Sequence, residues 1–129
     1  MIVIVFGLPG SGKSYFASRL AIIINAGYVN SDRLRKEMFR DRTYSEREKA
    51  AVYKAMLEKM NEAMNQNRNL VLDATFYKNE TRKLFIQEAE RMDGIFFIEV
   101  KADENIIRER LKEERPYSEA DFEVYKVIR

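Results

Sequence analysis

One glycine-rich stretch near the N-terminus constrains the fold of this chain more than any other feature. Residues 7–14 read Gly-Leu-Pro-Gly-Ser-Gly-Lys-Ser and fit the pattern G-x-x-x-x-G-K-[ST], with Gly7, Gly12, Lys13 and Ser14 at the four fixed positions. Glycines allow a tight curl in which successive backbone N–H groups point inward toward phosphate oxygens. The pattern therefore predicts a loop that binds the phosphates of a nucleoside triphosphate.

The segments on both sides of the loop agree with this prediction. Residues 1–6 form an unbroken apolar run, which is typical of a strand buried on both faces. Residues 15–26 predict a helix with Phe16, Leu20 and Ile23 or Ile24 on one stripe and with Gly27 as its end. The alternative is a turn that matches the pattern by chance, and strand, loop and helix together weigh against it.

Two residues of the loop have specific chemical tasks. Lys13 would bring a positive charge to the β- and γ-phosphates, and the Ser14 hydroxyl can ligate Mg²⁺. The helix that follows would direct the positive end of its dipole toward the anion. The residues expected to contact the triphosphate are Gly7, Leu8, Pro9, Gly10, Ser11, Gly12, Lys13, Ser14 and Tyr15.

Composition limits the chemistry that the chain can perform. Its 129 residues, 46% hydrophobic and 34% charged, predict one folded domain spanning residues 1–129. The net charge of +2 argues against a broad surface that coats nucleic acid. Cysteine is absent, and histidine is absent, so a general base must be a carboxylate. No apolar run is long enough to span a membrane, and the chain opens directly on a strand, so we expect a cytoplasmic protein.

The remaining sequence alternates between strand and helix patterns. This alternation predicts an α/β fold, namely a three-layer αβα P-loop NTPase with a parallel sheet of about four strands in the order 2-3-1-4. A stripe at helical spacing that includes Met56 and Met60 favours a core position over a plastic binding surface. The predicted strands are 28–30, 69–75 and 95–100. The predicted helices are 33–40, which has Ser31-Asp32 as its cap, a long helix after the capping box Ser45–Glu48, and the helices 79–92 and 103–114. A last segment, 119–129, is capped by Ser118.

Three chemically active positions fall at the carboxyl ends of predicted strands, where parallel sheets bind ligands. They are Gly7, the pair Ser31-Asp32, and Asp73. Asp73 is either a carboxylate that holds Mg²⁺ or a cap for the following turn, and the phosphate loop favours the first. Asp32 is either a helix N-cap or a general base, with Arg35 on the same helix face as a clamp for an anion. The pattern alone leaves both interpretations of Asp32 open.

Residues 108–115 mix charges of both signs at helical spacing. Such a run is commonly a solvated face with ion pairs. It could also be a lid, about residues 103–118, that brings arginine charge to the transferring phosphoryl group.

The order of these motifs resembles a family of small P-loop kinases. The motifs are the phosphate loop, residues 30–35 (Asn-Ser-Asp-Arg-Leu-Arg), residues 72–75 (Leu-Asp-Ala-Thr) with Arg82, and an Arg-x₄-Arg at Arg110 and Arg115. The family includes polynucleotide 5′-hydroxyl kinases, zeta-toxin kinases and small kinases described as AAA-type ATP-binding proteins. The resemblance covers essentially the whole chain.

This resemblance implies an ATP- and Mg²⁺-dependent phosphotransferase acting on a hydroxyl. It implies that Asp32 is the base, that Arg35 binds the acceptor together with Thr75 and Arg82, and that Arg110 and Arg115 are lid arginines. The acceptor would be a polynucleotide 5′-hydroxyl, or a nucleotide sugar or another small molecule as in zeta-toxin kinases. Phage-type polynucleotide kinases carry paired acids where this chain has residues 31–33, Ser-Asp-Arg.

The family usually continues into a further strand beyond its last helix, whereas this chain stops at Arg129. We therefore expect a truncated or minimal member whose sheet lacks a final strand. Residues 95–100 would then form an apolar edge, through which two copies could pair into a homodimer.

Two other classes of function compete with a kinase. A GTPase-like switch would carry Asp-x-x-Gly after the second apolar strand and an Asn-Lys-x-Asp, and neither is present. A nucleotide-binding or ATPase module without a second substrate is compatible with the motifs. A second pocket lined by Asp32, Arg35 and Arg82 would distinguish a kinase from such a module.

Overall fold

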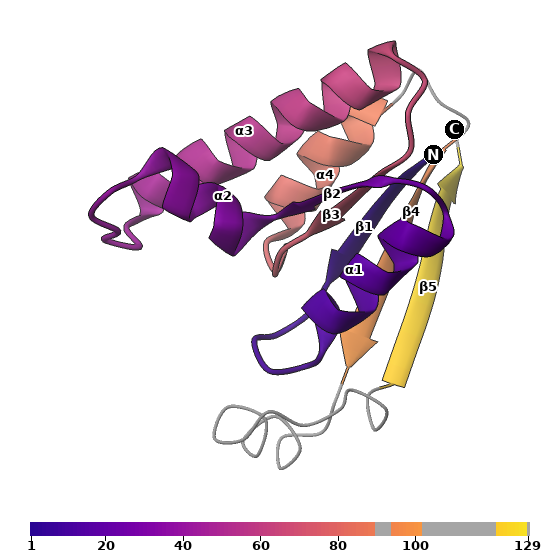
Figure 1. Cartoon of the computed structure of the whole chain (residues 1–129), viewed down its shortest axis with the longest axis horizontal. Coiled ribbons are helices and arrows are strands. Elements are labelled where there is room, and N and C mark those ends of the chain that lie inside the picture. The colour runs from indigo at the N-terminus through magenta and orange to yellow at the C-terminus, as the bar shows by residue number, and fades with distance from the viewer. Residues whose placement is uncertain (90–93, 102–120, 129) are drawn as a thin grey trace.

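A mixed β-sheet with helices on both faces forms the frame of the protein (Figure 1). The computed structural model describes residues 1–89, 94–101 and 121–128. Within these residues the elements are β1 (Ile2–Phe6), α1 (Lys13–Ile23), β2 (Gly27–Asn30), α2 (Ser31–Met38), α3 (Glu46–Asn65), β3 (Leu70–Asp73), α4 (Asn79–Glu88), β4 (Gly94–Lys101) and β5 (Asp121–Ile128).

The strand order of the sheet is β2-β3-β1-β4-β5, and the first four strands in this order are parallel. The predicted parallel order 2-3-1-4 and the αβα fold class are therefore confirmed. β1 is central, and its Val5 is in register with Asp73 of β3 and Ile98 of β4. On the other side of β3, Asp73 is in register with Asn30 of β2. The ends of three neighbouring strands thus meet at one rim.

The prediction that the sheet lacks a final strand is wrong. β5 pairs antiparallel with β4 over its full length, from Lys101↔Asp121 to Gly94↔Ile128. Residues 95–100 are therefore not an edge, and the homodimer expected through that edge loses its basis. The composition of residues 121–128 could have indicated this strand, because five of the eight are β-branched or aromatic.

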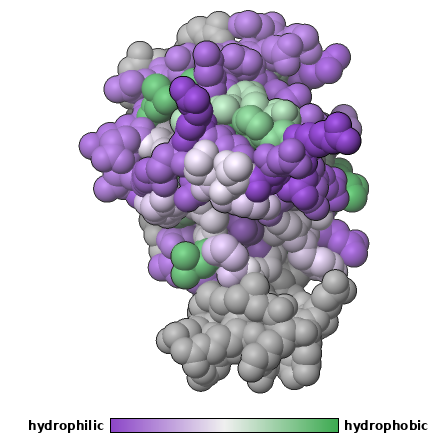
Figure 2. Space-filling view, turned by 90° about the vertical axis from the view of Figure 1, so that its left-hand side faces the viewer, coloured by the Kyte–Doolittle hydropathy of each residue, from purple (hydrophilic) through white to green (hydrophobic). Residues whose placement is uncertain are grey.

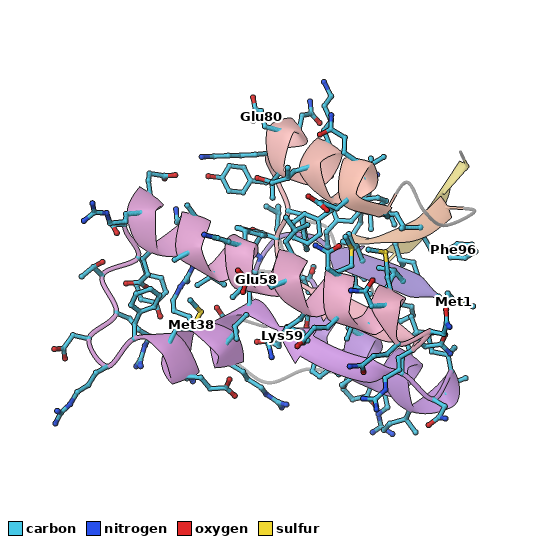
Figure 3. The ribbon with its side chains drawn as sticks, turned by 90° about the horizontal axis from the view of Figure 1, so that it is seen from above. Met1, Met38, Glu58, Lys59, Glu80 and Phe96 are labelled. Atoms are coloured by element: carbon cyan, nitrogen blue, oxygen red, sulfur yellow. The ribbon has the colours of Figure 1, made fainter. Side chains whose placement is uncertain are left out.

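Strand alternation divides the core into two layers. Ile2 and Ile4 face α2, α3 and α4, whereas Val3 and Val5 face α1 on the other side of the sheet. Met56 and Met60 are fully buried in the larger layer, so they are core residues (Figure 3 shows α3 above the sheet with α4 and α2 at its sides). Among the described residues, no helix has both the length and the apolar character needed to cross a membrane.

Three predicted helix ends differ from the structure. α2 ends at Met38, two residues before the predicted end at Arg40. α1 ends at Ile23, not near Gly27, because Asn25 adopts a left-handed conformation (φ 53°) that ends the helix. Ile24 is half-buried against the core, whereas Ile23 is exposed. α4 ends at Glu88, with Ala89 as its C-cap. The helix predicted over 103–114 and Ser118 lie outside the described residues.

Candidate active site

The glycine-rich loop joins β1 to α1 and adopts a conformation that requires glycine. Gly10 and Gly12 have left-handed backbones, with φ of 81° and 94°. Gly7 has φ of 149°, and a Cβ atom there would lie only 2.4 Å from the backbone oxygen of Val100 on β4. Any side chain at position 7 would therefore collide with a neighbouring strand at the point where the loop leaves the sheet.

The start of α1 presents backbone N–H groups beside the loop. Gly12 is the N-cap, and the first hydrogen bond of the helix runs from the Phe16 N–H to the Gly12 carbonyl at 3.2 Å. The N–H groups of Lys13 and Ser14 precede that bond, at the positive end of the helix dipole. This is the arrangement that binds phosphate at helix N-termini.

Four polar side chains meet beside this helix start in one hydrogen-bonded network, the rim network: Ser14, Tyr28, Asn30 and Asp73. The Tyr28 hydroxyl donates to Asp73 Oδ2 at 2.5 Å. Asn30 Nδ2 lies 2.9 Å from Asp73 Oδ2 and 3.2 Å from both the Ser14 hydroxyl and the Tyr28 hydroxyl oxygen. The network joins α1, β2 and β3 at the carboxyl rim of the sheet.

Strand periodicity explains why these side chains meet. Val71 of β3 packs in the α1 layer, so Asp73, two residues later, lies on the same face. Tyr28 of β2 also packs against that layer, and Asn30 follows it by two residues. Our sequence interpretation missed Tyr28 and Asn30 as site residues, although the period of two could have identified them.

Only one of the two carboxylate oxygens of Asp73 is hydrogen-bonded. The residue is fully buried, and in the described structure its Oδ1 has no hydrogen-bond partner. A buried carboxylate oxygen without a partner carries a large desolvation cost unless a cation or water fills the gap. Asn30 bridges this carboxylate to the Ser14 hydroxyl, and hard oxygen ligands of this kind suit Mg²⁺. The residues present therefore fit the expected magnesium site.

Burial, followed by the hydrogen bond to Asp73 and the negative charge of that carboxylate, raises the pKa of Tyr28 to about 12. An unfolded tyrosine titrates near 10, so the folded state holds this proton more tightly. We expect the stabilisation to be complete below pH 10 and to be lost as the pH rises from about 10 to 12. Urea unfolding of metal-free protein across this range should show a smaller loss for Tyr28→Phe; an equal loss would contradict the assignment.

Asp32 lies in the first turn of α2, two residues after Asn30, and is exposed. The predicted N-cap pair Ser31-Asp32 is wrong by one position. The cap is Asn30, whose side-chain oxygen accepts from the Arg33 N–H at 3.0 Å. Asp32 is therefore not needed as a cap, and it lies in the first turn of the helix that Asn30 caps.

Arg35, also on α2, is buried and forms an ion pair with a residue of α3. Its Nε lies 3.2 Å from Glu48 Oε1, and both side chains are at most 10% exposed. Burial works against ionisation of Glu48, yet hydrogen bonds from Thr43 and the charge of Arg35 lower the pKa of its carboxyl overall. Ser45 does cap α3, but the Glu48 carboxylate holds Thr43 and Arg35. The predicted capping box is thus only half formed.

Thr75 lies just beyond β3, and contacts from α3 and α4 fix the turn around it. The Tyr53 hydroxyl lies 3.3 Å from Thr75 Oγ1 and accepts from the Phe76 N–H at 3.1 Å. Arg82 donates to the Phe76 carbonyl and to Asn79 Oδ1. Phe76 is fully buried with φ of 46°, an uncommon conformation for a bulky residue. These contacts hold Thr75 at the rim.

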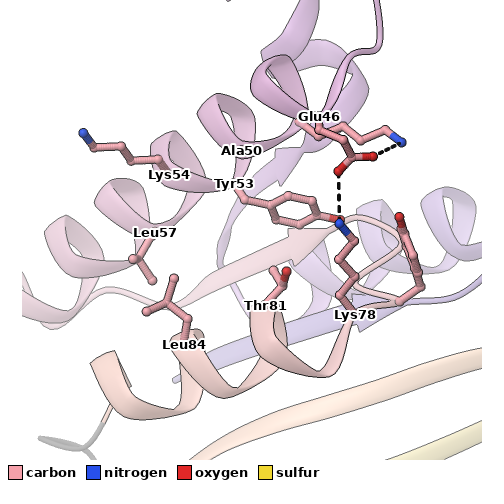
Figure 4. Close-up of a pocket in the computed structure, with 10 residues that line it drawn as sticks. Glu46, Ala50, Tyr53, Lys54, Leu57, Lys78, Thr81 and Leu84 are labelled. Carbon is pink, nitrogen blue, oxygen red and sulfur yellow. Dashed lines mark hydrogen bonds and ion pairs between the residues drawn. The ribbon is translucent and has the colours of Figure 1, made fainter.

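Two cavities lie near this turn. Arg82 lines one of about 500 Å³ between α4 and β4, together with Phe6 and Glu99. The other, of about 390 Å³, is a groove between α3 and α4 with Tyr53 and Lys78 in its wall (Figure 4). Neither cavity is lined by Asp32 or Arg35, so the acceptor pocket expected from all three residues is not formed by either one. Arg110 and Arg115 lie outside the described residues.

The comparisons with known proteins give a family and a set of similar folds. A model of the AAA domain family matches residues 2–127. A search of curated proteins finds no match. A gluconokinase from Sinorhizobium meliloti 1021 is 19% identical over 90% of this chain and 68% of its own, with a TM-score of 0.69. A sugar kinase from Janibacter sp. HTCC2649 is 17% identical over 88% of this chain and 67% of its own, with a TM-score of 0.68.

A larger assembly contains the same fold. A chain of the Pnkp1/Rnl/Hen1 complex is 22% identical, with a TM-score of 0.74 over 99% of this chain and 45% of its own length. The present chain therefore spans less than half of that protein and about two thirds of the two kinases. At identities below 25%, these likenesses establish the architecture that carries the rim network.

Proposed function

Because the chain belongs to the AAA domain family, whose model matches residues 2–127, we propose that it is an ATP-dependent phosphotransferase. It would move the γ-phosphate of ATP to a hydroxyl group of an acceptor. The observation that carries the proposal is the rim network, in which Asn30 connects Ser14, the second residue of α1 after the phosphate loop, to a fully buried Asp73.

The first half of the site would hold the nucleotide. Lys13 and the loop amides would bind the β- and γ-phosphates, while Ser14 and Asp73 would hold Mg²⁺ directly or through water. When bound, Mg²⁺ would offset negative charge on the phosphate oxygens. Phosphoryl transfer depends mainly on positioning and charge, which suits a chain that has neither histidine nor cysteine.

The second half of the site would activate the acceptor. The Asp32 carboxylate would take the proton of the acceptor hydroxyl while the oxygen of that hydroxyl attacks the γ-phosphorus. The bond from that phosphorus to the β–γ bridging oxygen then breaks, and ADP leaves with the electron pair. Thr75, Arg82 and Arg35 are proposed to contact the acceptor, and the ion pair with Glu48 already engages Arg35 Nε. Arg110 and Arg115 are proposed to close over the reaction.

The surface around α2 bears on the acceptor class. Arg33, Lys36, Arg40 and Arg42 are exposed, and the face that carries the α2–α3 connection is mostly hydrophilic (Figure 2). These cations could follow a phosphodiester backbone, although a solvated helix face is their commoner use. A polynucleotide 5′-hydroxyl is the first acceptor class to test, and a nucleotide sugar or another small polyol is the second.

A panel of hydroxyl acceptors with γ-labelled ATP tests the proposal. We expect label to move to one class among oligonucleotide 5′-hydroxyl ends, nucleotide sugars, nucleosides and free sugars, in a reaction that needs Mg²⁺. Lys13→Ala, which removes the charge at the phosphates, should abolish the transfer and serves as the blank. Release of labelled phosphate to water without transfer to any acceptor would contradict the proposal and favour a plain ATPase module.

A further inference from the structure

Asn30 bonds two residues proposed to hold Mg²⁺ and also caps the helix that carries the proposed base. Its Nδ2 bonds the rim oxygens of Asp73 and Ser14, and its Oδ1 caps the helix that carries Asp32. We propose that Asn30 is a positioning residue that couples the Mg²⁺ ligands to the proposed base. This inference rests on the phosphotransferase function and gives a role to Asn30, which the motif at residues 30–35 contains without a role of its own.

The orientation of the Asn30 amide is fixed by its partners. The Arg33 N–H can only donate, so the atom facing it at 3.0 Å must be the amide oxygen. The ionised Asp73 carboxylate can only accept, so the atom facing Oδ2 at 2.9 Å must be the amide nitrogen. Both ends of the amide are thus satisfied in one orientation and would be mismatched in the other.

The Asn30 amide has fewer protons to donate than it has neighbouring acceptor oxygens. Its NH₂ group carries two protons, and three oxygens lie within 3.2 Å of Nδ2, on Ser14, Tyr28 and Asp73. Asp73 is both the nearest and the charged acceptor, so it takes the strongest of these bonds. The Ser14 hydroxyl, at 3.2 Å, can therefore turn toward a cation without breaking the bond between Asn30 and Asp73.

The proposed coupling rests on the short separation along the chain between Asn30 and Asp32. Asp32 is two residues after Asn30, on the first turn of α2, and that turn is tied to Asn30 through Arg33. A shift of the Asn30 side chain would move the rim oxygens and the helix start together. Asparagine suits this position because it combines an acceptor for the helix with donors for the rim on a short side chain, whereas aspartate would oppose Asp73 with a second negative charge.

The test uses variants that separate the function of the amide oxygen, which caps α2, from that of the amide nitrogen, which bonds Ser14 and Asp73. In Asn30→Ser and Asn30→Thr the hydroxyl can still cap α2, but it replaces the amide that reaches Ser14 and Asp73. Asn30→Ala removes both functions. Ser45→Ala, which removes the cap of α3 away from the rim, is the matched control for the loss of a helix cap alone. The measurements are the thermal midpoint, the Mg²⁺ dependence of binding of a fluorescent ATP analogue, and kcat and KM with the accepted hydroxyl.

We expect Asn30→Ser and Asn30→Thr to unfold at a higher temperature than Asn30→Ala. Both should nevertheless need about 10- to 100-fold more Mg²⁺ for half-maximal nucleotide binding, with kcat lowered by a similar factor, as is typical when a residue that orients metal ligands is lost. Ser45→Ala should lower only the thermal midpoint.

Two results would overturn the inference. If both cap-retaining variants keep the wild-type Mg²⁺ dependence, Asn30 is a helix cap and nothing more. If Ser45→Ala changes the Mg²⁺ dependence as much as they do, the effect belongs to general destabilisation. The Mg²⁺ titration of nucleotide binding needs no acceptor, so it decides whether Asn30 orients the Mg²⁺ ligands even if the acceptor panel shows no transfer and the phosphotransferase proposal fails.

Discussion

Replacing Asp32 with alanine is expected to slow phosphoryl transfer by about 10²- to 10⁴-fold, the range that a general base contributes, while ATP still binds. Asp32 is exposed, and Asn30, not Asp32, caps α2, so its removal should leave the fold and the rim network intact. The chain offers no imidazole to replace it. Transfer of label from γ-labelled ATP and binding of a fluorescent ATP analogue measure the two effects separately.

Two further variants distinguish the loss of a base from the loss of nucleotide binding. Asp32→Asn keeps the size of the side chain and removes its basicity, so it should be nearly as slow as Asp32→Ala. Lys13→Ala should weaken ATP binding and transfer together, because its charge belongs to the phosphates and not to the acceptor. Full turnover in both Asp32 variants would exclude Asp32 as the base and would leave the rim without a named proton acceptor.

The parts of the fold that local patterns determine could be predicted from the sequence. Residues 1–6 and 70–72 are continuous apolar runs, and they form most of β1 (Ile2–Phe6) and β3 (Leu70–Asp73), as expected. The spacing of Gly7, Gly12 and Lys13 predicted the loop between strand and helix, which the structure confirms. These features are specified within about ten residues of chain, so no tertiary information was needed.

The parts that depend on distant contacts could not be predicted in this way. Arg35 and Glu48 form their ion pair across two helices, and nothing in either local pattern indicates that pairing. The predicted strand order and the period of two place Ser14, Asn30 and Asp73 at one rim, but which of their atoms bond depends on the register of β2 against β3. β5 was missed because its apolar residues do not alternate cleanly, although their type favours a strand.

The same rim network explains why Asp73 should serve function at the expense of stability. Its carboxylate is fully buried, and the cation that would suit Oδ1 is present only when the site is loaded. Without a cation, a buried ionised group costs free energy that its two hydrogen bonds, from Tyr28 and Asn30, offset only in part. Functional sites commonly retain such locally unfavourable groups.

Asp73→Asn is therefore expected to lower phosphoryl transfer by about 100-fold while the free energy of unfolding of the metal-free protein stays the same or rises. An asparagine oxygen can still accept from Tyr28 and Asn30, but the neutral side chain no longer attracts Mg²⁺ and no longer carries a buried charge. Urea unfolding and the transfer assay measure the two effects, and Asp41→Asn, an exposed carboxylate outside the rim network, is the control that should change neither. A strongly destabilised Asp73→Asn with normal transfer when folded would reverse this interpretation, since Asp73 would then hold the turn after β3 and not a cation.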